Sequence, residues 1–300
     1  VTYTISITDD SEVTTGDEPR TATKDVVITI NGANDNPVLS VSSLQNTDTD
    51  TLTESTDGSG LTTSGTLTAA DLDLTNTPSI SLDQVVASGV TTGLSSNNTE
   101  LRDMLILPGD PLLSSAQTIN QFTWAFNSGA QNFNYLANGE RLTLTYTVQL
   151  CDDIPGSVDA THNIVIHIDG TNDDPSITAG DVTGDISEAG TLSDSGSITF
   201  NDVDLTNRPE ASKATHSISA LRSDGSTSFD LTQDQLTDLA NAFSITTADG
   251  ATNSGTVNWD YSILESQLDF LAANETVTAV FNIVVTDNEL QTATQQVTVN

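Results

Sequence analysis

The amino-acid sequence predicts an all-β protein, built from tandem antiparallel β-sandwiches joined end to end, with a short helix in at least one repeat. Three observations predict this class. Apolar and polar residues alternate with a period of two, Thr, Val and Ile are frequent between turn-forming Gly, Asn and Asp, and the whole pattern repeats along the chain. The lack of a βαβ rhythm favours Greek-key sandwiches over a parallel sheet.

The clearest strand pattern covers residues 142–150. The apolar residues that alternate there with Thr and Gln are Leu142, Leu144, Tyr146, Val148 and Leu150. A period of two places one face of a strand on a core and the other face in water. The pattern recurs at residues 277–285, and residues 26–30, 163–168 and 296–299 are predicted to form the closing strand of each repeat.

One short helix is predicted after residue 232. Thr232 and Gln235 form a capping box, in which the two residues satisfy each other's free backbone N–H groups. The apolar residues that follow at helical spacing are Leu236, Leu239, Ala240 and Phe243. Residues 98–105 are a weaker counterpart in the preceding repeat.

Two sequence motifs show that the chain repeats itself. Gly-Ala-Asn-Asp-Asn-Pro at residues 32–37 returns as Gly-Thr-Asn-Asp-Asp-Pro at residues 170–175. Asp-Leu-Asp-Leu-Thr-Asn at residues 71–76 returns as Asp-Val-Asp-Leu-Thr-Asn at residues 202–207. Self-similarity of this kind identifies a repeat architecture.

A third copy is present only as its tail, because residues 3–10 align with residues 146–153 and with residues 281–288. We therefore predict that residues 1–31 are the last two strands of a truncated repeat, and that residues 32–169 and 170–300 are two nearly complete β-sandwich repeats. Such a cut across a repeat has two explanations. The sequence is either a fragment of a longer chain or a self-assembling subunit.

The chain is strongly acidic, with 42 Asp and Glu against 7 Lys and Arg and a formal net charge of −35. This balance argues against nucleic-acid binding, which needs a basic footprint, and against adsorption to an anionic membrane. No apolar run is long enough to insert across a bilayer. Cations are the expected partners, because self-repulsion weakens the compact state unless counter-ions bind. General solubility and adaptation to saline water are alternative explanations of the composition.

The acidic residues cluster near the repeat boundaries, which predicts calcium sites, because calcium takes six to eight ligands that are mostly carboxylate and carbonyl oxygens. The predicted ligands at the first boundary are Asp9, Asp10, Asn34, Asp35, Asn36, Glu54, Asp71 and Asp73. Those at the second boundary are Asp152, Asp153, Asn172, Asp173, Asp174, Glu188, Asp202 and Asp204. A lone Asp-x-Asp is more often a solvated loop, but a matching set at two successive boundaries favours a metal.

Several segments carry a resemblance to a known family. They are Asp25–Pro37 and Asn163–Pro175 at the ends of repeats, and Gly255–Trp259, Leu268–Ala272 and Glu275–Thr276 in the middle of one. Together they resemble VCBS repeats, and the resemblance covers essentially the whole chain. One departure is Cys151, which stands before Asp152 and Asp153 where Thr8 precedes Asp9 and Asp10. We interpret Cys151 as a small, half-buried filler rather than a reactive thiol.

The resemblance implies a cadherin-like or immunoglobulin-like fold with a calcium-binding Asn-Asp-x-Pro linker. VCBS repeats are typical of giant secreted bacterial adhesins and biofilm proteins, often of the RTX type. This implies an extracellular location on a bacterial surface, and a role as an extender that holds an adhesive domain away from the cell. The partners expected are adjacent repeats of the same chain or neighbouring copies, with surface glycans or proteins as further candidates.

No catalytic constellation is evident, so we expect no enzymatic activity. The three His residues are scattered, whereas a zinc site needs several ligands converging on one point. Trp124 and Trp259 occupy matching positions among alternating apolar residues, which favours core packing over sugar stacking. Two alternatives to the extender remain open. One is a filament subunit assembled by strand complementation, because residues 1–31 are strands without a sandwich; the other is a glycan- or protein-binding adhesion module.

Overall fold

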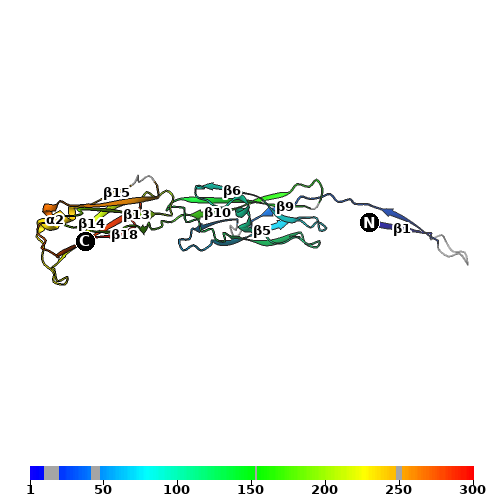
Figure 1. Ribbon diagram of the computed structural model, residues 1–300. Helices are drawn as coiled ribbons and strands as arrows, with labels where there is room; N and C mark the ends of the chain where they lie inside the picture. Colours follow the sequence, from blue (N-terminus) through cyan, green and yellow to red (C-terminus); the bar gives the residue numbers. More distant parts are fainter. Residues whose placement is uncertain (10–19, 42–47, 153, 248–251) are drawn as a thin grey trace.

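The computed structural model describes residues 1–9, 20–41, 48–152, 154–247 and 252–300, which form a rod of three parts in line (Figure 1). The first part is a hairpin of β1 (Thr2–Thr8) and β2 (Thr21–Val27). The second part, module 1, contains β3 (Val38–Ser40), β4 (Thr49–Thr53), β5 (Thr62–Ala70), β6 (Ser79–Gly89), α1 (Asn98–Asp103), β7 (Leu105–Ile106), β8 (Ile119–Asn127), β9 (Arg141–Cys151) and β10 (Ala160–Asp169). The third part, module 2, contains β11 (Ser176–Ala179), β12 (Thr183–Gly184), β13 (Ser193–Asn201), β14 (Glu210–Leu221), α2 (Gln233–Asn241), β15 (Phe243–Thr247), β16 (Ser254–Ser262), the 3₁₀ turn η1 (Glu265–Gln267), β17 (Thr276–Thr286) and β18 (Thr292–Val299).

Each module consists of two four-stranded sheets. Their strand orders are β3-β5-β8-β7 and β4-β10-β9-β6 in module 1, and β11-β13-β16-β15 and β12-β18-β17-β14 in module 2. All pairings are antiparallel except β4 with β10 and β12 with β18, which are parallel. The prediction of tandem all-β sandwiches is thus confirmed. The prediction described the sandwiches as antiparallel, whereas each module also contains one parallel pair of strands. β2 ends at Val27 and β3 begins at Val38, whereas β10 ends at Asp169 and β11 begins at Ser176.

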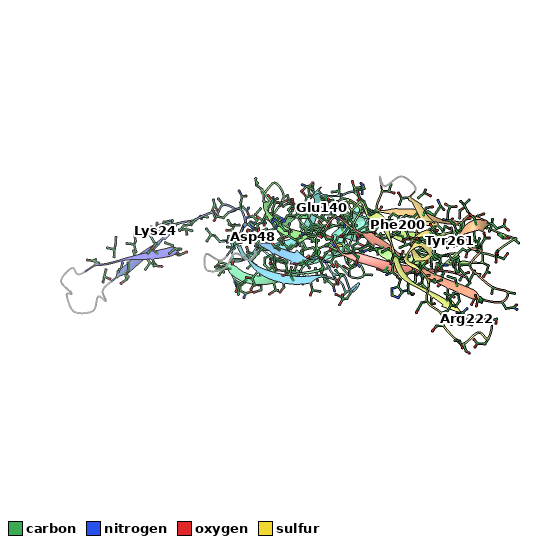
Figure 2. All side chains as sticks on the ribbon, turned by 90° about the vertical axis from the view of Figure 1, so that its left-hand side faces the viewer. Lys24, Asp48, Glu140, Phe200, Arg222 and Tyr261 are labelled. Carbon is green, nitrogen blue, oxygen red and sulfur yellow. The ribbon has the colours of Figure 1, made fainter. Side chains whose placement is uncertain are left out.

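The hydrophobic core of each module lies between its two sheets. In module 1, Trp124 on β8 and Tyr146 on β9 enter the core from opposite sheets, and both are buried. In module 2, Trp259 is fully buried and stacks on Phe243, which in turn stacks on Phe281. The interpretation of both Trp residues as core residues is therefore confirmed. Phe200 and Tyr261, labelled in Figure 2, belong to the core of module 2.

Both predicted helices are present. Thr232 is the N-cap of α2 and forms the complete capping box with Gln235. Asn97 caps α1 in the same way with Glu100. Each helix buries one leucine in the core of its module. In the part of the chain that the structure describes, no helix is both long enough and apolar enough to cross a bilayer.

Strand direction determines which residues meet at each end of a module. We call the end at which the first strand begins the N-terminal pole, and the opposite end the C-terminal pole. β10 runs towards the C-terminal pole, because it leads into the linker to module 2. β9 is antiparallel to β10 and therefore ends at the N-terminal pole. β4 is parallel to β10, so the residues after Thr53 lie at the C-terminal pole.

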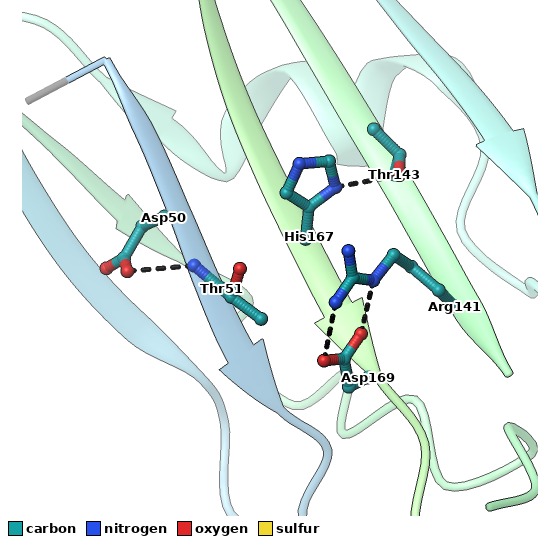
Figure 3. Close-up of polar contacts among 6 residues, drawn as sticks. All are labelled: Asp50, Thr51, Arg141, Thr143, His167 and Asp169. Atoms are coloured by element: carbon teal, nitrogen blue, oxygen red, sulfur yellow. Dashed lines mark hydrogen bonds and ion pairs between the residues drawn. The ribbon is translucent and has the colours of Figure 1, made fainter. Parts of the chain in front are cut away.

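The end of β10 is anchored before the linker begins. Arg141 on β9 forms a two-point ion pair with Asp169, the last residue of β10, in which Nη2 donates to Oδ2 at 2.7 Å (Figure 3). Two cross-strand pairs further along, Thr143 Oγ1 lies 2.9 Å from His167 Nδ1. The backbone N–H of Gly170 donates to the carbonyl of Glu140 at 2.9 Å. The linker therefore leaves module 1 from a fixed point.

Candidate metal centre

Three carboxylates from three separate segments meet where module 1 faces module 2. Glu54 follows β4 at the C-terminal pole of module 1, Asp173 belongs to the linker, and Asp204 follows β13 at the N-terminal pole of module 2. One oxygen of each lies within 4.8 Å of the others. We call this meeting point, formed by linker residues 170–175 and the two facing poles, the second joint. Glu140, which accepts the hydrogen bond of Gly170, lies between Asp48 of module 1 and Phe200 of module 2 along the rod in Figure 2.

Hydrogen bonds hold the carboxylates of Glu54 and Asp204 by one oxygen each. The N–H and the hydroxyl of Thr171 both donate to Glu54 Oε1, each at 2.9 Å. The N–H of Asp173 donates to Asp204 Oδ2 at 2.9 Å, and the N–H of Asp204 donates to Asp202 Oδ1 at 2.9 Å. The backbone of the linker and of the Asp-x-Asp turn thus fixes the orientation of the acidic side chains.

The second oxygens of the trio are buried without partners. Within the described residues, Glu54 Oε2, Asp173 Oδ2 and Asp204 Oδ1 are inaccessible to solvent and have no hydrogen-bond donor. An unpaired buried polar atom costs about 1–3 kcal/mol, and more for a charged group. Three buried carboxylates with unpartnered oxygens, one oxygen of each within 4.8 Å of the others, make a candidate cation site.

Burial also changes the acidity of the trio. Removal from water raises the pKa of Glu54 to about 7, against the lowering effect of the Thr171 hydrogen bonds. Burial likewise raises the pKa of Asp204 to about 7, with the nearby carboxylates of Asp202 and Asp173 adding to the effect. The pKa values of Asp173 and Asp202 are raised for the same reason. In the absence of a cation, therefore, the joint is electrostatically unfavourable when all four groups are ionised.

The donor set fits calcium. It consists of hard carboxylate oxygens, with no His or Cys in the trio. Calcium prefers such oxygen ligands and tolerates irregular geometry, whereas zinc favours nitrogen and sulfur. The three free oxygens of Glu54, Asp173 and Asp204 are the first candidates to hold the ion.

A second ring of polar residues supports the trio, and part of it is absent from the predicted set. Asn172 Nδ2 donates to Asp287 Oδ2 at 2.7 Å, and Asn207 Nδ2 donates to Asn172 Oδ1 at 3.1 Å and to Asp202 Oδ2 at 3.3 Å. Asn207 and Asp287 are buried. Both carried a signal in the sequence, because Asn207 ends the repeated Asp-x-Asp-Leu-Thr-Asn motif and Asp287 aligns with Asp152.

An apolar contact crosses the second joint beside the acidic residues. Leu205, next to Asp204, packs against the core of module 1, and its N–H donates to the carbonyl of Tyr135 at 3.3 Å. Gly93 makes room for it, since a Cβ there would lie 2.5 Å from Leu205 Cδ1 and 2.8 Å from the Tyr135 ring. The φ of Gly93, +97°, is also one that other residues rarely adopt. Sequence reasoning missed this contact.

The first joint, formed by linker residues 32–37 and the N-terminal pole of module 1, repeats the polar frame. Asn34 Nδ2 donates to Asp152 Oδ2 at 2.9 Å, and the N–H of Asp35 donates to Asp73 Oδ2 at 2.7 Å. Asn76 Nδ2 bridges to Asn34 Oδ1 at 3.1 Å and to Asp152 Oδ1 at 3.0 Å. Asp71, which has a buried oxygen without a hydrogen-bond partner among the described residues, completes the pattern through its bond from the N–H of Asp73.

The predicted assignment of ligands to the two boundaries was wrong for Glu54, Asp152 and Glu188. Glu54 was assigned to the first boundary but lies at the second, and Asp152 was assigned to the second boundary but lies at the first. Glu188 was also assigned to the second boundary, but it follows β12, which is parallel to β18, and lies at the C-terminal pole of module 2. The reason is strand direction. β9, which precedes Asp152, runs antiparallel to the closing strand β10 and ends at the N-terminal pole of module 1. The strands that precede Glu54 and Glu188 run parallel to the closing strands and end at the C-terminal poles.

The other predicted ligands have varied positions. Asp9 lies at the end of β1 where its N–H bonds the carbonyl of Arg20, at the hairpin end remote from the linker, so it does not join the first boundary. Asp10 and Asp153 lie outside the described residues. Asn36 Oδ1 accepts from the N–H of Val158 at 3.2 Å, and Asp174 is exposed at the edge of the second joint.

Comparisons with known proteins give similarity at the level of solved structures. No family model matches the chain, and no curated protein matches it. Cadherin domains 1–5 of protocadherin gamma B2 are 14% identical over 100% of this chain and 44% of that one, with a TM-score of 0.44. Domains EC1–4 of PcdhgB3 are 14% identical over 100% of this chain and 56% of that one, with a TM-score of 0.40. EC1–3 of mouse protocadherin-24 are 15% identical over 100% and 79%, with a TM-score of 0.34. The chain thus spans about half the length of the first two structures, and TM-scores below 0.5 are too low to transfer a function.

Proposed function

We propose that this chain is a calcium-stiffened extender segment of a large bacterial cell-surface adhesin of the VCBS type, with a structural role and no catalysis. One observation carries the proposal: the carboxylates of Glu54, Asp173 and Asp204 converge across a module boundary, and each has a buried oxygen without a partner. Because both modules and the linker contribute a carboxylate to this cluster, the distances between the carboxylates depend on the angle between the modules. The same chemistry at successive boundaries would set the direction of a long array.

Hydrogen bonds to the linker position the carboxylates of Glu54 and Asp204 at the second joint. Glu54 of module 1 is held by Thr171 of the linker, and one of its oxygens lies within 4.8 Å of an oxygen of Asp204 of module 2. Asp204 accepts a hydrogen bond from the backbone of Asp173, which fastens the linker to module 2. Bound calcium would supply the positive charge that these oxygens share. Without it, ionised carboxylates less than 5 Å apart repel one another, which favours separation of the two poles.

The resemblance and the composition of the chain also support a proposed location and proposed partners. The resemblance to VCBS repeats supports an extracellular position on a bacterial surface, with adjacent repeats of the same chain or neighbouring copies as the first partners. A chain with a net charge of −35 and one half-buried cysteine, Cys151, is consistent with a setting rich in divalent cations and independent of disulfides. Surface glycans or proteins are the further partners of such an array.

Small-angle scattering on the whole chain tests the proposal. In millimolar calcium we expect a maximum dimension that matches an extended rod, and in chelator a shorter average dimension with a broader distribution, because the second joint becomes a hinge. Magnesium at the same concentration is the control for ionic strength. Equal dimensions in calcium and in chelator would show that the metal does not stiffen the joint.

A second candidate function is a filament subunit that assembles by strand complementation. The observation that favours it is the hairpin, in which every described residue of β1 and β2 is exposed, including Tyr3, Ile5 and Ile7. A two-stranded sheet is marginal alone, and unpaired strand edges add to other sheets. Substitution of Ile5 by Lys would abolish such assembly, which sedimentation velocity measures, and would leave the calcium response of the second joint unchanged.

A further inference from the structure

Each sandwich has one side at which an edge strand of each of its two sheets contacts its helix. These edge strands are β6 and β7 beside α1 in module 1, and β14 and β15 beside α2 in module 2. We call this side the helix seam of a module. An edge strand carries backbone groups without a strand partner, and such groups pair readily with another strand. The helix seam is therefore a side at which wrong pairing between repeats is expected unless something opposes it.

An arginine from the helix closes the helix seam of module 1. Arg102, in the last turn of α1, donates through Nη1 to the carbonyl of Asp83 at 2.6 Å and through Nη2 to the carbonyl of Leu82. Both carbonyls belong to β6, at the point where the register of β6 shifts against β9. Hydrogen bonds from a charged donor are stronger than neutral ones. Arg102 thus fastens α1 to the edge of the sheet and covers two acceptors that an incoming strand would use.

A lysine from the strand closes the helix seam of module 2. Lys213 of β14 donates through Nζ to the carbonyl of Phe243, and its ammonium lies over the Phe243 ring, 5.7 Å from the ring centre. Phe243 begins β15 and directly follows Ala242, the C-cap of α2. Lys213 thus joins the two edge strands of this seam beside the end of the helix.

The helix position that carries the cation in module 1 is alanine in module 2. Arg102 follows the buried Leu101 of α1, and Ala240 follows the buried Leu239 of α2, so the two positions are equivalent. Ala240 is one of the residues that line a groove of about 360 Å³ between α2 and β14. The short side chain therefore leaves open, in module 2, the space between helix and strand that arginine crosses in module 1.

The strand position shows the reverse exchange. Leu82 pairs with Val148 of β9, and Lys213 pairs with Ile283 of β17. Val148 and Ile283 are equivalent in the aligned segments 146–153 and 281–288, so leucine in module 1 corresponds to lysine in module 2. Module 1 combines a helix arginine with a strand leucine, whereas module 2 combines a helix alanine with a strand lysine. Two of the seven Lys and Arg residues of the chain thus lie at the same seam, on opposite sides of it.

We propose that this exchange directs each helix to its own sandwich during folding and so prevents domain swapping between neighbouring repeats. Adjacent repeats of similar sequence are prone to inter-domain misassembly and swapping. If α1 docked on the seam of module 2, Arg102 would face Lys213, and the two like charges would repel each other at short range. If α2 docked on the seam of module 1, Ala240 would face Leu82, and the carbonyls of β6 would lose their charged donor.

Both wrong combinations are therefore disfavoured, whereas each correct combination has one cation at its seam. Specificity of this kind comes from building an unfavourable contact into the wrong pair as well as a favourable one into the right pair. The exchange concerns the assembly of the array, and it uses no residue of the candidate metal centre.

Refolding of four full-length chains from urea tests the proposal. Leu82→Lys with Arg102→Ala gives module 1 the seam residues of module 2. Lys213→Leu with Ala240→Arg gives module 2 the seam residues of module 1. Each of these double variants makes the two seams alike, and the quadruple variant with all four substitutions makes them different again. The residues of both joints stay unchanged, so refolding in calcium treats the four chains equally.

Size-exclusion chromatography with light scattering measures the yield of monomer. The parent and the quadruple variant should refold to monomer with equal yield, and each double variant should form at least about threefold more dimer and larger species. Urea midpoints of the purified monomers report the stability of the seams separately. If the cations only stabilised their own modules, losses would add up, and the quadruple variant would refold worst. That result, or equal yields in all four chains, would overturn the proposal.

Discussion

The two joints of the rod share one hydrogen-bonded frame but differ in what faces it. At the second joint, Asp204 is completely buried and Leu205 packs against the preceding module. At the first joint, the equivalent Asp73 is only partly buried and Leu74 is 54% exposed. The motif is the same in both places, whereas the burial of its side chains is not.

This difference shows that the strength of the candidate site belongs to the pair of modules rather than to the motif. The frame around Asn34 and Asn172 is built locally in each module. The raised pKa values and the carboxylate trio arise at the second joint, because Glu54 and the pole of module 1 remove that frame from water. Within the described part of the chain, no comparable trio forms at the first joint.

The largest expected effect comes from removing the central carboxylate at each joint. Asp204→Asn should lower calcium affinity at the second joint by at least about 100-fold, or about 2.7 kcal/mol, because the fully buried Asp204 is shared by the linker and module 2. Asp73→Asn is the matched control and should leave the second joint unchanged. Isothermal titration with calcium measures both variants. Equal losses in the two would show that the joints do not differ as described.

The next effect concerns pH in the absence of calcium. The pKa of Glu54 is about 7 in the folded chain and about 4.5 when unperturbed, so between these values the folded state binds a proton that the unfolded state has lost. Stability in chelator should therefore fall as pH rises from about 4.5 to 7, by about 3 kcal/mol. In calcium the trend should reverse, because ligands must be deprotonated to bind the metal. Urea unfolding at fixed pH values measures both trends, and a rise of stability with pH in chelator would contradict the assignment.

Replacing Glu54, the carboxylate that module 1 contributes to the second joint, should change the unfolding temperature in opposite directions with and without calcium. Glu54→Gln should weaken calcium binding about tenfold and lower the unfolding temperature in calcium. In chelator the same change should raise the unfolding temperature, since it removes a buried charge beside Asp173 and Asp204. Differential scanning calorimetry in the two buffers gives both signs. Glu188→Gln, which neutralises an exposed carboxylate outside the trio, should show neither effect.

The smallest effect distinguishes the apolar contacts. Leu205→Ala should destabilise the second joint by about 1 kcal/mol, because the side chain is partly buried against module 1. Leu74→Ala should change stability by less than about 0.5 kcal/mol, as is usual for exposed positions. Hydrogen exchange of the amides near Tyr135 and Gly93 reports the contact directly. Unchanged exchange in Leu205→Ala would mean that the leucine does not hold the poles together.

Much of the architecture could be predicted from the sequence, because its signals are local. Alternation at residues 142–150 and the capping box of Thr232 and Gln235 each depend on a few neighbouring residues. The Asp-x-Asp turns were also assigned to the correct joints, since Asp71 and Asp202 each follow a strand paired with the first strand of their own module.

The assignment of Glu54, Asp152 and Glu188 to joints failed for a non-local reason. Each is placed by the direction of a strand relative to the closing strand, and the parallel pairing of β4 with β10 has no signature in the sequence. The antiparallel relation of β9 and β10 could have been used, since two strands joined by a short connection usually pair that way. The docking of Leu205 depends on the shape left by Gly93 and Tyr135, which no pattern reports.

The closing strand β10 has a consequence for mechanical load. It is paired along its length with β9 on one side and over residues 165–169 with β4 on the other, and its last residue is tied to Arg141 before the linker begins. A pull along the rod draws this strand along its own axis, so the flanking hydrogen bonds bear the force in shear and must break together. The direction in which the chain leaves module 1 is therefore also the direction in which that module best resists tension.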